Sequence, residues 1–349
     1  MTDTSATSAK APSKAIEGII CVEIGMLLFV AQDGIMKVLL GPFPVWILIF
    51  SRAVVAILVL VPIILWLGKP HRLLTPLWQW HLARAALFTF GFTLFYTAFP
   101  FMGLAEVTTI FFSAPLFTAA LAAFWLGEYI GPHRIGALVV GFVGVLIAMN
   151  PTSDAFQWVA ILPVICAVTY AISQIIVRHI GEQETTLTVG LYTIALSGML
   201  IGPLGWAANQ MFSMGPDFHH MRWEFPALSG TDLIWLGTLG TVGMAAYLML
   251  SRAYQVANAS LVAPFDYTYL PFATLMAYVI WREVPGLTTI IGMVLIVGSG
   301  LYLAYREIVN ARRRDLPLVT AESTFAPGNP NPPVSLSADI EDPIADINQ

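Results

Sequence analysis

Long apolar stretches separated by short polar connections follow one another along most of the chain. Each is roughly 20 residues long, which is the length a helix needs to cross the hydrocarbon core of a bilayer. The pattern predicts ten membrane-spanning helices, near residues 15–40, 44–67, 80–101, 104–126, 132–149, 157–178, 185–208, 231–253, 258–281 and 286–305. An even number of spans places both termini on the same side of the membrane.

The composition excludes a soluble protein. Of the 349 residues, 57% are hydrophobic and only 11% are charged, and the mean hydropathy is +0.76. A soluble domain of this length could not bury so much apolar surface, because single cores stop growing near about 250–300 residues. We therefore expect an all-α integral membrane protein. Cys21 and Cys166 lie inside apolar stretches and are expected to pack as small buried side chains rather than form a disulfide.

Both ends of the chain are polar. Residues 1–14 are expected to form a short cytosolic tail, and residues 312–349 a disordered cytosolic tail, because they lack the apolar residues that would offset chain entropy. Basic residues favour this side of the membrane for both ends. With the N-terminus in the cytoplasm, only Lys37, Arg222 and Arg282 of the flanking basic residues lie at the outer face. The charge pattern thus predicts that both termini are cytoplasmic.

The two halves of the apolar region, residues 15–149 and 157–306, resemble each other. Residues 124–148 align with residues 278–304 at a nearly constant offset. The matched residues are Glu128 with Glu283, Gly136 with Gly292, and Gly144 with Gly300. Each half has an odd number of spans, so the second half must cross the membrane in the opposite direction. Inverted repeats of this kind are typical of transporters, whose site lies near the midplane between the halves.

Ionisable side chains inside the predicted spans are the first candidates for a functional site. Each costs at least about 2.5–3.5 kcal/mol to insert, so such residues are rare without a role. Asp33 and Lys37 are four residues apart on one helix and can pair, either to fix packing or to meet a charged substrate. Arg52 always carries its charge. We expect it either to pair with Asp33 or Glu106 or to bind substrate directly.

Two further acids lie near the ends of spans. Glu106 begins the fourth span, where a negative charge complements the helix dipole, and this alone could explain it. Glu23 lies about two turns inside the first span. It either stays ionised near water or becomes protonated within the bundle, in which case it could couple transport to protons.

The ninth span contains the stretch "SLVAPFDYTYLPFATL", residues 260–275, in which Asp266 stands among prolines and tyrosines. Pro264 and Pro271 remove backbone donors and free the carbonyls four residues before them, those of Ser260 and Tyr267. Pro115 does the same for the carbonyl of Phe111 in the fourth span. Freed carbonyls are tolerated at membrane depth only inside protein or beside water. The stretch, with Tyr267 and Tyr269, therefore predicts either a cavity wall or an internally hydrogen-bonded kink.

Aromatic residues form a stripe on the third span. Phe92, Phe95, Tyr96 and Phe99 recur at spacings of three and four residues, and Tyr170 of the sixth span could join them. The stripe is either ordinary packing or a pocket for a planar or cationic solute, since aromatic faces bind both.

Four blocks of sequence carry a family resemblance. They are "AQDGIMK" (31–37), the "SR" of residues 51–52, "GLAEVTTIFFSAPLF" (103–117) with "LGE" (126–128), and "ANASLVAPFDYTYLPF" (257–272). In these blocks the chain resembles the ten-helix drug/metabolite transporter superfamily with paired EamA-type domains. The resemblance implies an inner-membrane carrier of small organic solutes. Some members export amino acids or drugs, and similar bacterial branches import riboflavin or S-adenosylmethionine.

The expected function is secondary transport by alternating access, coupled to protons or by facilitation. Import of a metabolite like riboflavin or S-adenosylmethionine is one alternative, and export of amino acids or drugs is the other. An intramembrane enzyme is a more distant alternative, because no catalytic or metal-binding spacing accompanies the six histidines. A sensor is equally distant, because it would need a recognisable signalling domain and the polar tail is too short for one. We expect no enzyme activity, cofactor, metal or nucleic-acid partner. The expected partners are a small-molecule substrate and the lipid bilayer, and a homodimer stays open.

Overall fold

The structure is a computed structural model that describes residues 11–69, 71, 73–125, 132–150, 158–180, 184–257 and 262–314. All regular structure in these ranges is helical. In chain order the helices are α1 (Ala11–Leu39), α2 (Val45–Leu67), α3 (Trp78–Thr97), α4 (Leu104–Phe111), α5 (Ala114–Trp125), α6 (Pro132–Met149), η1 (Trp158–Ala160), α7 (Ile161–Ile180), α8 (Thr186–Met211), η2 (Pro216–Met221), α9 (Gly230–Val256), η3 (Ala263–Thr268), α11 (Tyr269–Trp281) and α12 (Leu287–Arg314). Glu128, Ser260, residues 1–10 and residues 315–349 lie outside the described residues.

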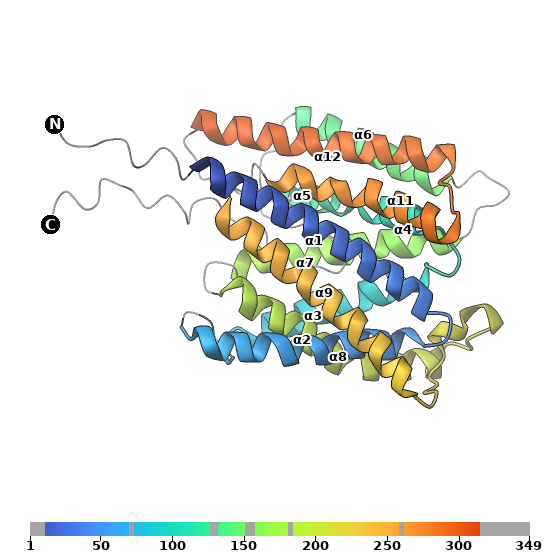
Figure 1. Cartoon of the computed structure of the whole chain (residues 1–349). Helices are drawn as coiled ribbons and strands as arrows, with labels where there is room; N and C mark the ends of the chain where they lie inside the picture. The colour runs from blue at the N-terminus through green and yellow to red at the C-terminus, as the bar shows by residue number, and fades with distance from the viewer. Residues whose placement is uncertain are drawn as a thin grey trace.

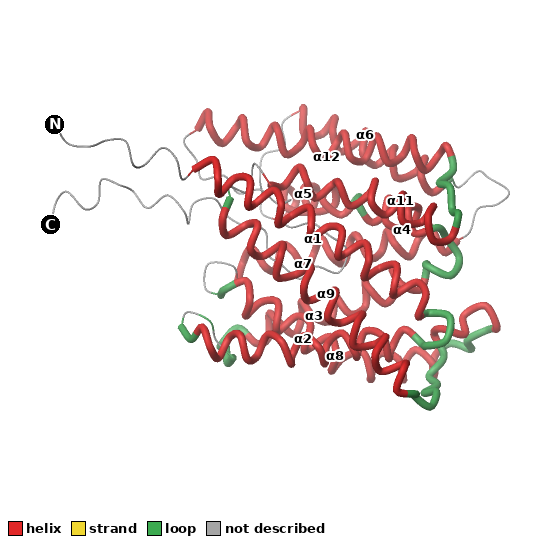
Figure 2. Tube along the Cα trace, in the orientation of Figure 1, coloured by secondary structure: helices red, strands yellow, loops and turns green. Residues whose placement is uncertain are grey.

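The predicted spans are confirmed as helices of one bundle. Eight segments are long and apolar enough to cross a membrane, and one of them combines α4 with α5. The other two predicted spans are α3 and the segment formed by η3 and α11. In Figure 1, α1 begins and α12 ends at the same end of the bundle, and η2 lies at the other end. Figure 2 shows that the connecting loops gather at these two ends.

The helices pack with the symmetry expected of two inverted repeats. Helix α1 of the first half packs along α9 of the second, and the equivalent pair, α7 with α3, packs in the same way. The same holds for two further sets of equivalent pairs. The contact of α5 with α7 corresponds to that of α11 with α1, and the contact of α3 with α8 corresponds to that of α9 with α2. The self-equivalent pairs α2 with α8, α4 with α11, and α6 with α12 also contact one another. The halves are therefore interleaved, and most of the core is their shared interface.

The fourth and ninth spans are broken at equivalent places, next to prolines. The fourth span is interrupted at Phe112 and Ser113, and Pro115 lies in the first turn of α5. The ninth span opens with the 3-10 turn η3, and Pro271 lies in the first turn of α11. A proline is tolerated in the first turn because its missing donor would have no partner within the helix. The prolines thus begin new helices, and the two breaks meet where the ring of Phe112 packs on Tyr267 and Tyr269.

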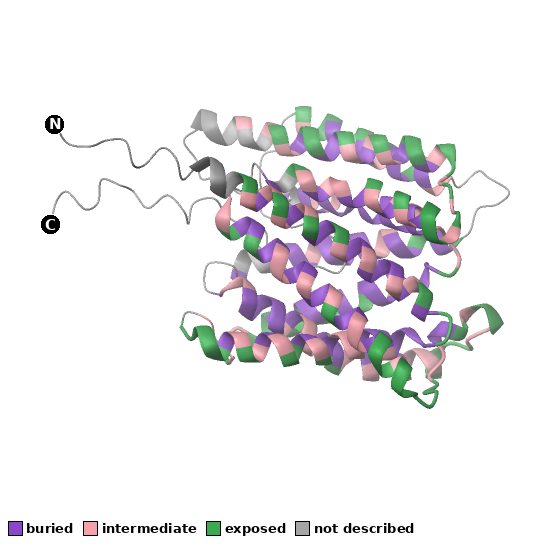
Figure 3. Ribbon diagram, viewed as in Figure 1, coloured by how far each residue is buried: buried purple, intermediate pink, exposed green. Residues whose placement is uncertain are grey.

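Apolar side chains cover the outside of the bundle as well as its core. Figure 3 shows exposed positions along the outward faces of the helices and buried positions between them. Leu58, Val139 and Val294 are among the large apolar residues that are more than half exposed. Exposed side chains of this kind face the hydrocarbon of a membrane without cost.

A close crossing of glycines joins α6 to α12. A Cβ atom on Gly292 would lie 2.6 Å from the carbonyl oxygen of Gly144, so the two backbones are in direct contact. Such a close approach of two backbones is typical of glycines at helix crossings. Among the described residues, by contrast, no atom lies within 4 Å of a Cβ built on Gly136 or Gly298.

Candidate functional site

A cavity of about 630 Å³ opens at the end of the bundle opposite to the start of α1. Both halves contribute to its wall. The lining comes from the end of α1, the α3–α4 connection with the start of α4, the turn η2, and the end of α11 with the α11–α12 connection. It includes Lys37, Phe99, Phe101, Met102, Glu106, His219, Trp281 and Glu283. Its volume is that of a site for a small organic molecule.

Lys37 forms an ion pair across this cavity wall. Its ammonium lies 2.5 Å from Oε1 of Glu283, donates to the carbonyl of Met102 at 3.3 Å, and lies 5.0 Å from the ring centre of Trp281. The sequence predicted that Lys37 could pair with Asp33, and the structure corrects this. Lys37 is one turn nearer the end of α1, so its side chain reaches the α11–α12 connection.

Asp33 is fully buried at the centre of a polar network. Its two carboxylate oxygens accept hydrogen bonds from Tyr269 at 2.6 Å, Tyr96 at 3.3 Å and Gln32 at 3.1 Å. The hydroxyl of Tyr96 in turn accepts from Arg52 at 2.7 Å. Arg52 therefore reaches Asp33 through a tyrosine rather than directly, and both halves supply donors to the carboxylate.

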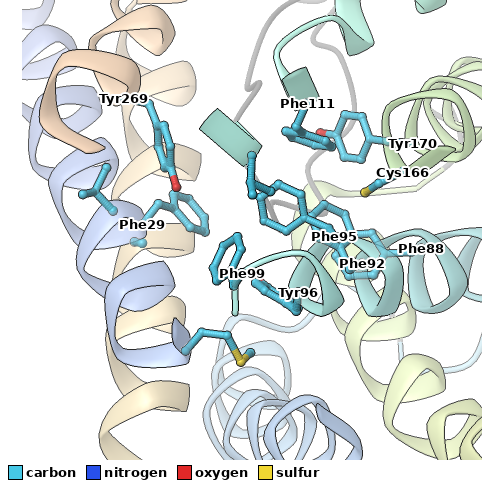
Figure 4. Packing of buried hydrophobic residues seen from close by; sticks show 14 of the residues in the cluster. Phe29, Phe88, Phe92, Phe95, Tyr96, Phe99, Phe111, Cys166, Tyr170 and Tyr269 are labelled. Carbon is cyan, nitrogen blue, oxygen red and sulfur yellow. The ribbon is translucent and has the colours of Figure 1, made fainter. Parts of the chain in front are cut away.

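Phe99 separates the cavity from this network. It lines the cavity, and its ring packs on Tyr96 with the ring centres 5.4 Å apart. Because Tyr96 binds Asp33, the cavity and the buried charge are one aromatic layer apart. Figure 4 shows Phe99 and Tyr96 side by side, with Tyr269 across from them.

The predicted aromatic stripe forms a packed cluster. Phe92 contacts Phe95, Tyr96 and Phe111, and Tyr170 of α7 packs edge-on against Phe92 with centres 6.1 Å apart (Figure 4). The side chain of Gln174 donates to the Tyr170 hydroxyl at 2.8 Å. These rings contact one another directly, which is the packing alternative that the sequence left open.

Asp266 lies in η3 and is also buried. One of its oxygens accepts a hydrogen bond from Tyr254 of α9 at 2.9 Å. Glu23 of α1 is half-buried near Thr268, at the end of the same turn. This is the internally hydrogen-bonded arrangement, one of the two that the sequence allowed. The hydroxyl of Tyr267 points to Gly300, where a side chain would collide with it.

Glu106 caps the start of α4. Its carboxylate accepts the backbone N–H of Gly103 at 3.2 Å, as expected for an acid in a first helical turn. Glu106 also lines the cavity, so its charge contributes to the field there.

Several site residues were not predicted from the sequence. Glu283 was noted only as a repeat match, and Gln32 was not singled out. Arg84 was counted among the cytoplasmic flanking charges, yet it is fully buried and donates to Thr193 of α8. The available signal was its position seven residues into α3, where a flanking charge is already inside the bundle.

The turn η2 covers the same end of the bundle as the cavity. Phe218 packs on Phe101, and His220 is buried against both rings. Burial, aided by neighbouring His219, lowers the pKa of His220 to about 4. His219 is exposed and lines the cavity.

Comparison with known proteins decides the family. The model of the EamA-like transporter family matches residues 16–150 and again residues 157–305. These two matches cover most of the chain, one in each half. The chain belongs to the EamA-like transporter family. It is thus a multi-pass membrane protein of a family of transporters, not of enzymes, as the resemblance in the sequence implied.

Relatives of the chain are named for different compounds. The chain is 29% identical over 258 residues to an S-adenosylmethionine uptake transporter of Rickettsia bellii, covering 74% of this chain and 83% of the relative. It is 29% identical over 262 residues to a riboflavin transporter of Vibrio cholerae, and the match covers 74% of this chain and 82% of that relative. It is 25% identical over 226 residues to a pseudopaline exporter of Pseudomonas aeruginosa, and the match covers 64% of this chain and 74% of that relative.

A solved structure supports the fold of this EamA-type chain. It superposes with a TM-score of 0.54 at 18% identity, covering 87% of this chain and 99% of the other. At that identity the likeness concerns the fold alone.

Proposed function

We propose that this protein is a secondary transporter that moves a small organic metabolite across the bacterial inner membrane by alternating access. The observation that carries the proposal is the cavity between the two halves, with buried Asp33 one aromatic layer beneath it. A buried carboxylate held by side chains from both halves responds to any movement of one half against the other. Substrate entering the cavity would pass Phe99 and reach this network.

The cavity favours a substrate with charge and an extended apolar or planar part. Lys37, Glu106 and Glu283 supply both signs of charge, and Phe99, Phe101 and Trp281 supply aromatic faces. S-adenosylmethionine, named for one relative, combines charges with a planar ring in this way, and riboflavin, named for another, offers a planar ring without a charge. The relatives' names include both uptake and export, so export of amino acids or drugs is the second candidate direction.

The roles of the candidate residues follow their depth in the bundle. We place Lys37 and Glu106 at the cavity, Asp33, Arg52, Tyr96 and Tyr269 beneath it, and Asp266, Tyr267 and Glu23 nearer to the termini. Phe92, Phe95 and Tyr170 support the wall beside the network. The carboxylates of Glu23 and Asp266 are the groups that would carry a proton if transport is proton-coupled.

Both termini are proposed to be cytoplasmic, because the basic residues cluster at the end where α1 begins and α12 ends. The cavity would then open to the outside. This follows from the charge pattern. To test it, single cysteines are introduced at residues 10 and 219 of a variant without Cys21 and Cys166; in intact cells an impermeant thiol reagent should label residue 219 and not residue 10.

Transport by purified protein in liposomes tests the proposal. Labelled S-adenosylmethionine, riboflavin and a set of amino acids would be offered on either side, with and without a proton ionophore. The proposal expects saturable movement of at least one compound that depends on the protein. Movement no faster than in empty liposomes for every compound and both directions would contradict it.

A further inference from the structure

The carboxylate of Glu283 is held in the cavity wall at both of its oxygens. Oε1 pairs with the ammonium of Lys37 at 2.5 Å, and Oε2 accepts the backbone N–H of Leu104 at 3.1 Å. Lys37 and Leu104 belong to the first half of the chain, and Glu283 to the second. The protein's own side chain therefore fills a complete carboxylate site at the interface of the halves.

The two sides of this contact differ in how firmly they are held. The Lys37 side chain is 10% exposed and is also fixed by the Met102 carbonyl and the Trp281 ring. The Glu283 side chain is 30% exposed and lies in the short connection after α11, where Arg282 has a left-handed backbone with φ of 58°. Glu283 is thus the partner that can leave while the lysine and the amide stay in place.

We propose that Glu283 is an internal competitor for the carboxylate of the substrate. A substrate with an α-amino-acid headgroup would take over Lys37 and the Leu104 N–H, and its ammonium would pair with the displaced Glu283. This inference rests on the proposed transport function, which it deepens by naming the headgroup and the residues that recognise it.

Charge pairing selects this class of ligand. Before binding, Lys37 and Glu283 neutralise each other. A simple anion would leave Glu283 without a cation, and a simple cation would leave Lys37 without an anion, which is costly for partly buried charges. A zwitterion leaves every charge paired. Aromatic contact with Trp281 is then available to the rest of the molecule.

Displacement of Glu283 also has a mechanical consequence. The contact ties the end of α1 and the start of α4 to the α11–α12 connection. When the substrate takes the place of Glu283, this direct tie is replaced by one that runs through the substrate, from Lys37 to its carboxylate and from its ammonium to Glu283. Substrate binding and movement of the halves are coupled through one carboxylate exchange.

Three probes separate the groups involved: L-methionine, its methyl ester, which lacks the carboxylate charge, and 4-(methylsulfanyl)butanoate, which lacks the amine. Dissociation constants come from the concentration dependence of thermal unfolding of the full chain in detergent. The wild type should bind L-methionine about tenfold or more tightly than either analogue, equivalent to one well-paired charge. In Glu283→Gln, the affinity for 4-(methylsulfanyl)butanoate should rise about fivefold or more, so that L-methionine no longer binds more tightly than this amine-free acid. In Lys37→Met, L-methionine and its ester should bind alike.

Glu17→Gln is the matched control. It removes a carboxylate from another interhelical ion pair, with Arg252 at 2.8 Å, at the opposite end of the bundle, and should behave as wild type. Glu283→Ala is measured in parallel with Glu283→Gln, so that a folding defect in one variant does not decide the result. The inference is overturned if the wild type binds none of the probes or binds all three with the same affinity. It is also overturned if the Glu283 variants change the dissociation constants of all three probes by the same factor. The liposome assay judges transport separately, so movement of riboflavin alone would sustain the function and overturn this inference.

Discussion

Asp33 shows how single residues make a buried charge stable in this protein. Its carboxylate accepts three hydrogen bonds, and the positive charge of Arg52 lies one hydroxyl away. A buried charge of this kind is tolerated only when each lone pair is met and a counter-charge is near. Removing one donor should therefore be felt in stability and in transport together.

Tyr269→Phe tests this at the shortest of these bonds. The change removes only the hydroxyl that donates to Asp33 at 2.6 Å. Because a hydrogen bond to a charged group contributes roughly 1.5–3 kcal/mol, the free energy of unfolding should fall by about that amount. Thermal and denaturant unfolding in detergent measure it. Tyr278→Phe, on the exposed face of the same helix, is the control and should change stability little; equal loss in both variants would contradict the role of the network.

For single residues, the sequence predicted the candidate site residues better than it predicted their partners. Asp33, Arg52 and Tyr96 were all candidates, and they do meet. The partner of Lys37 was missed because spacing along one helix reveals neighbours within that helix only. Glu283 comes from a connection 246 residues away, and such a contact depends on how the repeats interleave.

The broken spans are the main feature at the scale of elements. The interruption between α4 and α5 and the turn η3 before α11 lie at equivalent places in the two repeats and touch through Phe112. The prolines in the sequence predicted both breaks. The sequence could not decide whether the second break lines a cavity, because this depends on Tyr254 of another helix.

Two glycines of the same helix, α12, should respond to alanine with opposite changes in the free energy of unfolding. A Cβ on Gly292 would press on the backbone of Gly144 at 2.6 Å, whereas no atom of the described ranges lies within 4 Å of a Cβ on Gly298. We expect Gly292→Ala to lower the free energy of unfolding by roughly 1–3 kcal/mol through overpacking. Gly298→Ala should raise it by about 0.5–1 kcal/mol through helix propensity. Unfolding curves of the two variants decide this, and a stabilising Gly292→Ala would contradict the close crossing.

The docking of η2 should depend on pH. The pKa of His220 is lowered to about 4, so the docked turn favours the neutral imidazole. The undocked histidine binds a proton below its ordinary pKa of about 6.5. Docking is therefore fully stable above that pH and weakens as the pH falls toward 4, by roughly 3 kcal/mol in total.

Hydrogen exchange of the η2 amides, corrected for intrinsic rates, measures this change. In His220→Phe the pH dependence should disappear, because the aromatic contact stays and the titrating group is gone. His219→Gln, which alters the exposed neighbour, should keep it. Identical pH profiles in wild type and His220→Phe would show that another group is responsible.

For the whole molecule, the symmetric helix contacts explain why the cavity is shared by both repeats. Each helix of one half packs on a helix of the other, so the halves cannot move without changing the interface that contains Asp33. The number of spans and the repeat were predicted from apolar periodicity and the aligned glycines. The interleaved packing was not, because one sequence does not say which equivalent helices touch.

The most direct test of this account is exchange transport in liposomes by Asp33→Asn and Asp266→Asn, beside the wild type and Asp232→Asn. Asp232 lies in the exposed capping box of α9 and is the control acid. Whichever of S-adenosylmethionine or riboflavin the wild type exchanges, both interior variants should lose about tenfold or more of the rate, while they are still expressed and still unfold cooperatively on heating. Asp232→Asn should keep the wild-type rate. A wild-type rate in Asp33→Asn would contradict the claim that substrate passes between the halves at this carboxylate.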